Sequence, residues 1–135
     1  MMVEFPLQLP ARGLPTRMGS SYLARLWDVD YRNIVRWAEL GLLEFRQEGL
    51  ARVYYRPAVE AFARAAIPVR LLKPDMVVRH PRWAAGTPVR VIEALPGPLM
   101  WSVTYRTADG TLEHPPRCPG YRIVLQVPDG QAGDL

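Results

Sequence analysis

The chain has 135 residues, of which 49% are hydrophobic, and a formal net charge of +4. No apolar run approaches the roughly 18 residues of a membrane span, and the N-terminus lacks the basic start and long apolar stretch of a secretory signal, which favours a cytoplasmic protein with no membrane contact. With one cysteine and two histidines, the chain offers no internal disulfide and no spacing typical of structural zinc, so we expect no metal and no cofactor.

Residues 20–27 predict a first short helix, because their apolar side chains recur near the spacing of one helical face. These apolar residues are Leu23, Ala24, Leu26 and Trp27. We expect the hydroxyl of Ser20 or Ser21 to cap the first free amides. Asp28 tolerates the left-handed conformation of a tight turn, and Asp30 can cap the next helix. The turn is therefore three or four residues long, as a helix-turn-helix requires.

The second helix, residues 31–40, is the candidate recognition helix. Its inward positions are Ile34, Trp37, Ala38 and Leu40. Its exposed side carries Tyr31, Arg32, Asn33 and Arg36. Arginine reads guanine and asparagine reads adenine in the major groove, so we expect Arg32, Asn33 and Arg36 to contact bases. Tyr31 would bond a phosphate or pack on a thymine methyl group.

A hairpin and a third helix follow. Residues 43–47 and 51–55 predict two strands around a turn that contains Gly49. A third helix over residues 56–66, with Pro57 in its first turn, would stop before Pro68. Its inward positions are Val59, Phe62 and Ala63.

Three short motifs occur in this region in a fixed order. They are Ala24 with Val29-Asp30, then Ile34-Val35-Arg36-Trp37 with Gly41 and Leu43, then Tyr54 or Tyr55 with Val59 and Phe62. In order and spacing, residues 18–66, within an expected domain of residues 17–67, resemble the MerR-type and excisionase-like winged helix-turn-helix family. The resemblance implies a DNA-binding domain whose second helix reads the major groove and whose hairpin is the wing. We expect the excisionase-like branch, because no long dimerisation helix follows Ala66.

Further arginines would contact the phosphate backbone or the minor groove, and so set affinity more than sequence choice. On or beside the wing these are Arg46, Arg52 and Arg56, and beside the first helix they are Arg17 and Arg25. The alternative is that the helix and wing arginines pair within the protein. Asp28 or Glu39 would then pair with Arg32 and Arg36. Glu44 and Glu48 would pair with Arg46 and Arg52.

The aromatic residues of this domain are expected to fill its core rather than to stack on bases. Trp27, Trp37 and Phe62 all fall on the inward sides of their helices. One of the adjacent residues Tyr54 and Tyr55 must point inward, and we expect Tyr54 to be the outward one.

After Ala66 the pattern changes from helical to strand-like. Five segments separated by Pro- and Gly-bearing loops predict strands at residues 69–72, 76–79, 88–94, 100–106 and 121–127. We expect a small antiparallel β domain over residues 68–128, either an SH3/Tudor-like barrel or an open sheet, and hence an α+β chain. Residues 1–16 would form an extended arm and residues 129–135 a flexible tail.

The β domain also carries a resemblance. The residues concerned are Val78, His80, Trp83 and Gly86. Through them, residues 75–106 resemble the Tudor/SH3-like small barrels of bacterial transcription-coupling factors and helicase tails. This implies a protein-binding module that could touch RNA polymerase. Trp83 follows Arg79 and Arg82 in a loop, where it would anchor a protein partner or stack on a base.

Catalysis finds little support, because no nucleophile and base stand at a persuasive spacing and no phosphate-binding glycine loop occurs. His114 and Cys118 fall in a proline-rich segment that we expect to be a surface loop. We therefore expect a protein that is not an enzyme.

The sequence predicts a nucleoid-associated protein that binds double-stranded DNA, as a transcriptional regulator or a recombination accessory factor. One winged module contacts few base pairs, so a homodimer, cooperative binding or tethering by the β domain would supply a second reader. The alternative is a protein-interaction adaptor that recruits the transcription machinery through the β domain.

Overall fold

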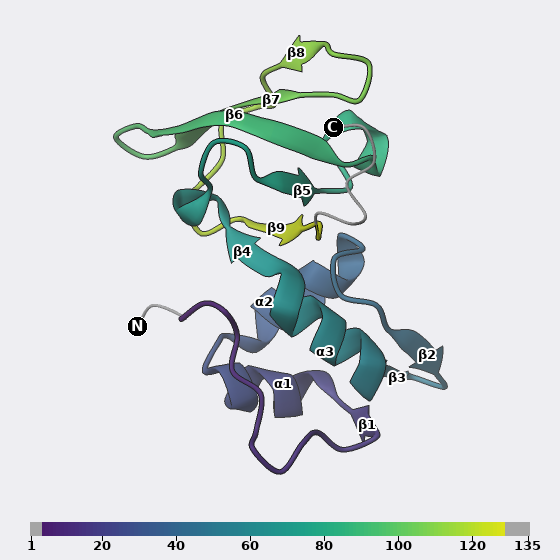
Figure 1. The fold of residues 1–135 in the computed structure, drawn as a ribbon. Coiled ribbons are helices and arrows are strands. Elements are labelled where there is room, and N and C mark those ends of the chain that lie inside the picture. The colour runs from purple at the N-terminus through teal and green to yellow at the C-terminus, as the bar shows by residue number, and fades with distance from the viewer. Residues whose placement is uncertain (1–3, 129–135) are drawn as a thin grey trace. The chain divides into compact units, whose positions relative to one another are not determined.

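The chain divides between Ala66 and Ile67 into two units, each described below by itself (Figure 1). The computed structural model describes residues 4–128, so the predicted tail, residues 129–135, lies outside the described residues. Helices and antiparallel sheets together confirm the predicted α+β class. Within the described residues, every helix is too short or too polar to cross a membrane.

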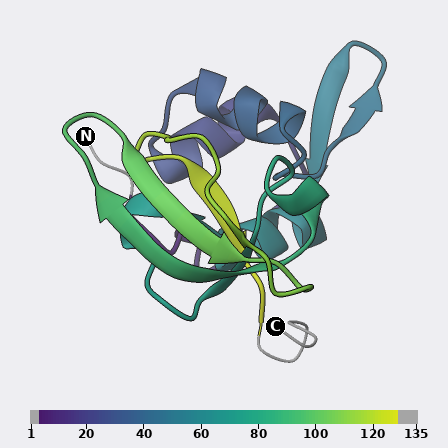
Figure 2. The ribbon, with the colours of Figure 1, turned by 90° about the horizontal axis from the view of Figure 1, so that it is seen from above.

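The first unit contains three helices and a three-stranded antiparallel sheet. Its elements are β1 (Arg17–Met18), α1 (Ser20–Trp27), α2 (Tyr31–Glu39), β2 (Arg46–Glu48), β3 (Ala51–Tyr55) and α3 (Arg56–Ala65). The strand order is β1-β3-β2, so the last strand of the hairpin lies in the centre. The β2–β3 hairpin projects from the helices of this unit (Figure 2).

The turn between α1 and α2 follows the local sequence signals. Asp28 has a left-handed backbone with φ of 51°, and its amide closes the C-terminus of α1. Asp30 caps α2, because its side chain accepts a 2.8 Å hydrogen bond from the amide of Arg32. Gly41, with φ of +81°, ends the helical segment. Both expected turn roles of the aspartates are confirmed.

The start of α1 differs from the expectation. Gly19 occupies the N-cap position and no side chain caps the helix, so the predicted serine cap is wrong. Ser20 lies inside the helix, and its Oγ shares a 3.0 Å hydrogen bond with the hydroxyl of Tyr54. Tyr54 is fully buried and Tyr55 only half-buried, which reverses the expected orientation of the two tyrosines. The reason is the register of β3, which directs Tyr54 towards α1.

The core of the first unit is built around three aromatic rings, as predicted. Trp37 and Phe62 lie 5.3 Å apart between ring centroids, and Trp27 lies within 6.5 Å of both. The segment expected to be an extended arm also contributes, because Leu7 and Leu14 are buried. The indole of Trp27 donates a 2.9 Å hydrogen bond to the carbonyl of Gln8. This segment is therefore part of the unit rather than a free arm.

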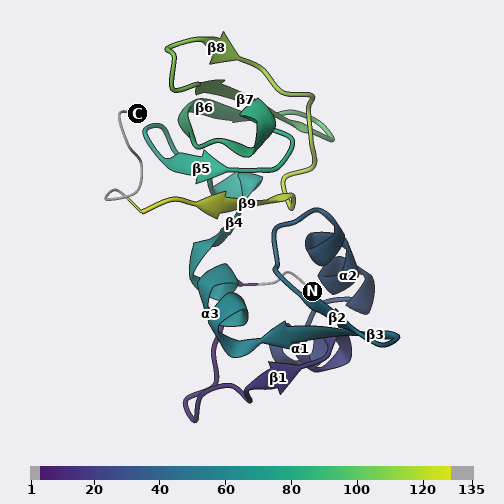
Figure 3. The same ribbon diagram turned by 90° about the vertical axis from the view of Figure 1, so that its right-hand side faces the viewer.

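The second unit is dominated by a six-stranded sheet. Its elements are β4 (Ala66–Pro68), the 3-10 turn η1 (Val69–Leu71), β5 (Val77–Arg79), the 3-10 turn η2 (Ala84–Gly86), β6 (Val89–Pro96), β7 (Trp101–Arg106), β8 (Leu112–Glu113) and β9 (Ile123–Gln126). The strand order is β4-β9-β5-β6-β7-β8, so β9 returns to lie between β4 and β5 (Figure 3). Of the two expected forms, the described residues adopt the open sheet, with β4 and β8 at its edges.

Four of the expected strands correspond to β5, β6, β7 and β9, whereas the expected strand at residues 69–72 is wrong. The extended segment lies immediately before these residues, in β4, and residues 69–71 then form a 3-10 turn. The amide of Val69 still bonds to the carbonyl of Arg122 at 2.8 Å, because this turn lies beside the segment before β9.

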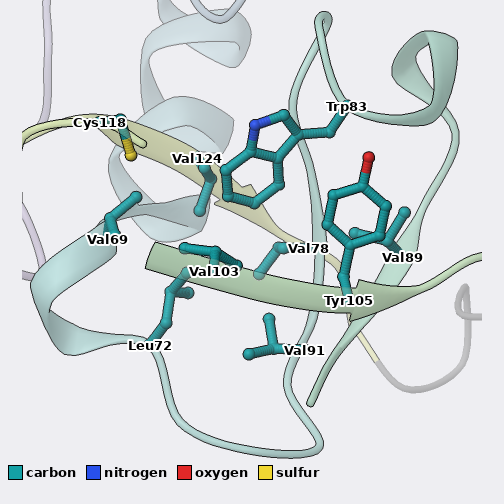
Figure 4. Close-up of a cluster of buried hydrophobic side chains, with 10 residues drawn as sticks. All are labelled: Val69, Leu72, Val78, Trp83, Val89, Val91, Val103, Tyr105, Cys118 and Val124. Atoms are coloured by element: carbon teal, nitrogen blue, oxygen red, sulfur yellow. The ribbon is translucent and has the colours of Figure 1, made fainter. Parts of the chain in front are cut away.

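One face of this sheet covers a hydrophobic core (Figure 4). Its buried residues are Val69, Leu72, Val78, Trp83, Val89, Val91, Val103, Tyr105, Cys118 and Val124. Cys118, expected in a surface loop, is instead buried and exchanges two backbone hydrogen bonds with Trp101. Burial raises the pKa of its thiol. His114 is exposed, as expected for that loop.

Candidate nucleic-acid interface

The side of α2 turned away from the core carries the residues singled out from the sequence. Arg32, Asn33 and Arg36 are all exposed. Arg32 and Arg36 are four residues apart and Asn33 lies three residues before Arg36, so the three share one side of the helix. Tyr31 is 52% exposed at the start of α2. The opposite side is anchored by Ile34 and the aromatic core, and this fixes which side meets solvent.

Arg32 has an internal partner, although not one of the two predicted. Its Nε and Nη2 atoms donate to the two carboxylate oxygens of Asp30, each at 3.2 Å. These hydrogen bonds lower the pKa of Asp30 and raise the pKa of Arg32. Both side chains are largely exposed, so the ion pair contributes little to stability and can exchange for a ligand.

Arg36 lies in the last turn of α2 and has no carboxylate within 4.0 Å among the described residues. Glu39, one of its two expected partners, binds Arg52 instead. Arg36 and Asn33 therefore present their full hydrogen-bonding capacity to solvent.

Arg52, a predicted phosphate contact, is engaged within the first unit. Its Nη2 donates to Oε1 of Glu39 at 3.2 Å, and its Nη1 donates to the carbonyl of Val35 at 3.4 Å. The guanidinium also lies 4.8 Å from the ring centroid of Phe45. All these partners belong to the protein, so the guanidinium of Arg52 links the hairpin to α2.

On the hairpin, Arg46 is the arginine that stays accessible. Its guanidinium lies over the ring of Tyr55, 5.1 Å from the centroid, and the side chain is exposed. The neighbouring carboxylate, Glu48, is bound by Arg17 and by the hydroxyl of Tyr55, and this hydrogen bond raises the pKa of Tyr55. Glu48 is thus paired with Arg17 rather than with Arg46 or Arg52 of the hairpin, and Arg17 is correspondingly engaged.

Two further predicted contacts lie elsewhere in the first unit. Arg25 is exposed in the last turn of α1, and Arg56 is exposed and donates to Oγ1 of Thr16 at 3.2 Å. Leu50, at the tip of the hairpin, is 104% exposed and is not among the predicted contact residues. Its position beside Gly49, in the predicted turn of the hairpin, was the feature of the sequence that indicated an exposed side chain.

The predicted partner site of the second unit is not assembled as expected. Arg79 and Arg82 are exposed, but Trp83 is only 3% exposed. Its indole stacks on Tyr105 with 5.6 Å between ring centroids, and it also lies beside His80. Trp83 is therefore a core residue, because the turn before η2 folds back over the sheet (Figure 4).

His80 is buried against this indole, and its Nδ1 accepts a 3.1 Å hydrogen bond from the amide of Arg82. Its Nε2 has no partner among the described residues. Burial, followed by the charges of Arg122 and Arg82, lowers the pKa of His80 to about 4. Nowhere in residues 4–128 do three or more His, Cys, Asp or Glu side chains gather in a way that could hold a metal ion.

Comparison with known proteins adds no relative: no family model, no curated protein and no solved structure matches this chain.

Proposed function

We propose that the first unit is a winged helix-turn-helix of the MerR and excisionase-like type and that it binds double-stranded DNA. In this proposal α2 enters the major groove and the β2–β3 hairpin is the wing. The observation that carries it is the exposed side of α2, where Arg32, Asn33 and Arg36 lie together after a three-residue turn.

Base recognition falls to Arg36 and Asn33. An arginine fork matches O6 and N7 of guanine, and the asparagine amide matches N6 and N7 of adenine. The absence of a carboxylate near Arg36 in the described residues supports this role, since no ion pair must break before binding. Arg32 can exchange Asp30 for a base or a phosphate.

Backbone contacts fall to exposed arginines at the margins of the same unit. Among the arginines that the sequence singled out for this role, Arg25, Arg46 and Arg56 have no carboxylate partner in the described residues. Phosphate contacts of this kind fix the register of a protein on DNA without reading the sequence. The biological role proposed is transcriptional regulation or assistance of recombination.

The deciding experiment is selection of binding sites from a random duplex library by the purified full chain. We expect one enriched motif, for which Arg36→Ala lowers the affinity by about fivefold or more, because a bidentate contact to guanine contributes roughly 1–3 kcal/mol. Arg64→Ala is the matched control, since Arg64 is an exposed helix arginine paired with Glu60 on α3. Absence of enrichment, together with no retention of duplex at low salt, would overturn the proposal.

The adaptor hypothesis is now less well supported. It depended on an exposed indole at Trp83, and that side chain lies in the core of the second unit. We therefore favour DNA binding.

A further inference from the structure

Three arginines line up on the second sheet. Arg90 of β6 is directly opposite Arg106 of β7, and it is also opposite Val77 of β5. Arg79 lies two residues beyond Val77 and therefore occupies the diagonal position next to Arg90. Diagonal neighbours of this kind have about 7–8 Å between their Cα atoms. We call Arg79, Arg90 and Arg106 the arginine row.

The pleat of the strands keeps this row off the core face. The neighbouring residues Val78, Val89 and Tyr105 point into the hydrophobic core, and successive side chains of a strand alternate between faces. The three arginines consequently share the opposite face, where Arg79 and Arg106 are exposed and Arg90 is half-buried.

The row places like charges beside one another. Like charges directly opposite one another destabilise a strand pair, and Arg90 faces Arg106 in this way. Arg90 is held by a 2.9 Å hydrogen bond from its Nη1 to the carbonyl of Asp75. Arg79 and Arg106 have no carboxylate within 4.0 Å among the described residues.

The surrounding composition adds to the same sign of charge. Residues 67–128 contain eight basic residues and four acidic ones. The basic residues are Arg70, Lys73, Arg79, Arg82, Arg90, Arg106, Arg117 and Arg122. A row of guanidinium groups on a basic domain matches the phosphates of a nucleic acid backbone, which guanidinium groups can bind bidentately.

We propose that the arginine row is a second, sequence-independent contact to the phosphate backbone of duplex DNA. This inference rests on the proposed function of the first unit and deepens it, since the second unit then supplies affinity while α2 supplies sequence choice. The row would serve in place of a second reading module.

The test measures binding of the full chain to a fluorescent duplex of about 25 base pairs and random sequence, from about 50 to about 300 mM salt. We expect the double variant Arg79→Gln/Arg106→Gln to bind more weakly and to lower the magnitude of the salt slope by about 2, since each phosphate contact contributes about 0.9. Arg117→Gln, an exposed arginine of the same unit outside the row, should leave the slope unchanged.

Parallel measurements separate the possible failures. If Arg36→Ala weakens binding to a selected site while the double variant keeps the wild-type slope, the row is not a DNA contact and the proposed function stands. If only the double variant loses affinity, the row stands and the role of α2 fails. If the double variant loses binding to polyglutamate but not to DNA, the row binds an acidic protein and the inference is overturned.

The double variant should not melt at a lower temperature than the wild type, because Arg106→Gln removes the repulsion with Arg90.

Discussion

Arg52 of β3 is bound to Glu39 of α2, with 3.2 Å between Nη2 and Oε1. The same guanidinium reaches the carbonyl of Val35, so one side chain joins the hairpin to the helix proposed to read DNA. The angle between the β2–β3 hairpin and α2 therefore depends on an arginine that is itself engaged within the protein.

The first prediction concerns this link. Arg52→Ala should weaken DNA binding without changing its salt slope, because the residue positions the hairpin and contacts no phosphate. Arg46→Ala should instead lower the magnitude of the slope by about one. A double-mutant cycle of Arg52→Ala with Glu39→Gln should give a coupling free energy of roughly 0.2–1 kcal/mol in urea unfolding, as expected for an exposed ion pair. A slope change for Arg52→Ala as large as that for Arg46→Ala would contradict the positioning role.

The second prediction concerns the buried hydroxyl pair of Ser20 and Tyr54. Tyr54→Phe or Ser20→Ala should each lower the free energy of unfolding by about 1–3 kcal/mol, because each leaves one buried hydroxyl without a partner. The double variant should lose less than the sum of the two. Tyr55→Phe is the matched control, since its hydrogen bond to Glu48 is only half-buried and should contribute less. Equal losses for Tyr54→Phe and Tyr55→Phe in urea titrations would be inconsistent with the burial seen here.

The third prediction concerns Trp83. Trp83→Ala should destabilise the second unit by about 3–5 kcal/mol, since it removes a large buried side chain that stacks on Tyr105. Trp83→Phe should cost less, because it keeps an aromatic ring in the same place. Thermal unfolding followed by circular dichroism measures both. A stable Trp83→Ala variant that loses only a protein partner would restore the surface role predicted from the sequence.

The fourth prediction concerns pH. The pKa of His80 is about 4 in the folded chain and about 6.5 when unfolded, so the unfolded chain binds a proton that the folded chain excludes between these values. The free energy of unfolding should therefore fall as the pH drops from about 6.5 to about 4, by up to about 3 kcal/mol.

His80→Phe should remove this component of the pH dependence, whatever its effect on stability at pH 7. Urea midpoints measured at pH 7.5 and pH 4.5 for both proteins provide the comparison. An identical pH dependence in the two proteins would mean that His80 does not titrate in this range.

The local signals in the first unit predicted its elements well, because they act over a few residues. Local backbone conformation depends directly on residues such as Asp28 in the left-handed turn, Asp30 at the N-cap of α2 and Pro57 in the first turn of α3. The exposed side of α2 followed from the same logic, since Ile34 and Trp37 had to face inward. The serine cap failed because the choice between capping and a buried hydroxyl bond depends on Tyr54, 34 residues away.

In the second unit, the strands with clear alternation were predicted, and the residues between them were misjudged. Trp83 looked like a loop residue because its neighbours are Arg82 and small residues, and only the fold-back of the turn covers it. The β8 strand is two residues long and exists because it pairs with β7. A strand that depends on such pairing shows no recognisable pattern in its own sequence.

The sequence by itself thus determined the order of the helices, the polar side of α2 and most of the strands, since these depend on periodicity and on turn residues. Tertiary structure alone decided which arginines are engaged and which are accessible. Arg52 binds α2, Arg17 binds Glu48, and Arg79 stands in one row with Arg106. The physical reason is that strand register and packing bring together charged residues that lie far apart in the chain.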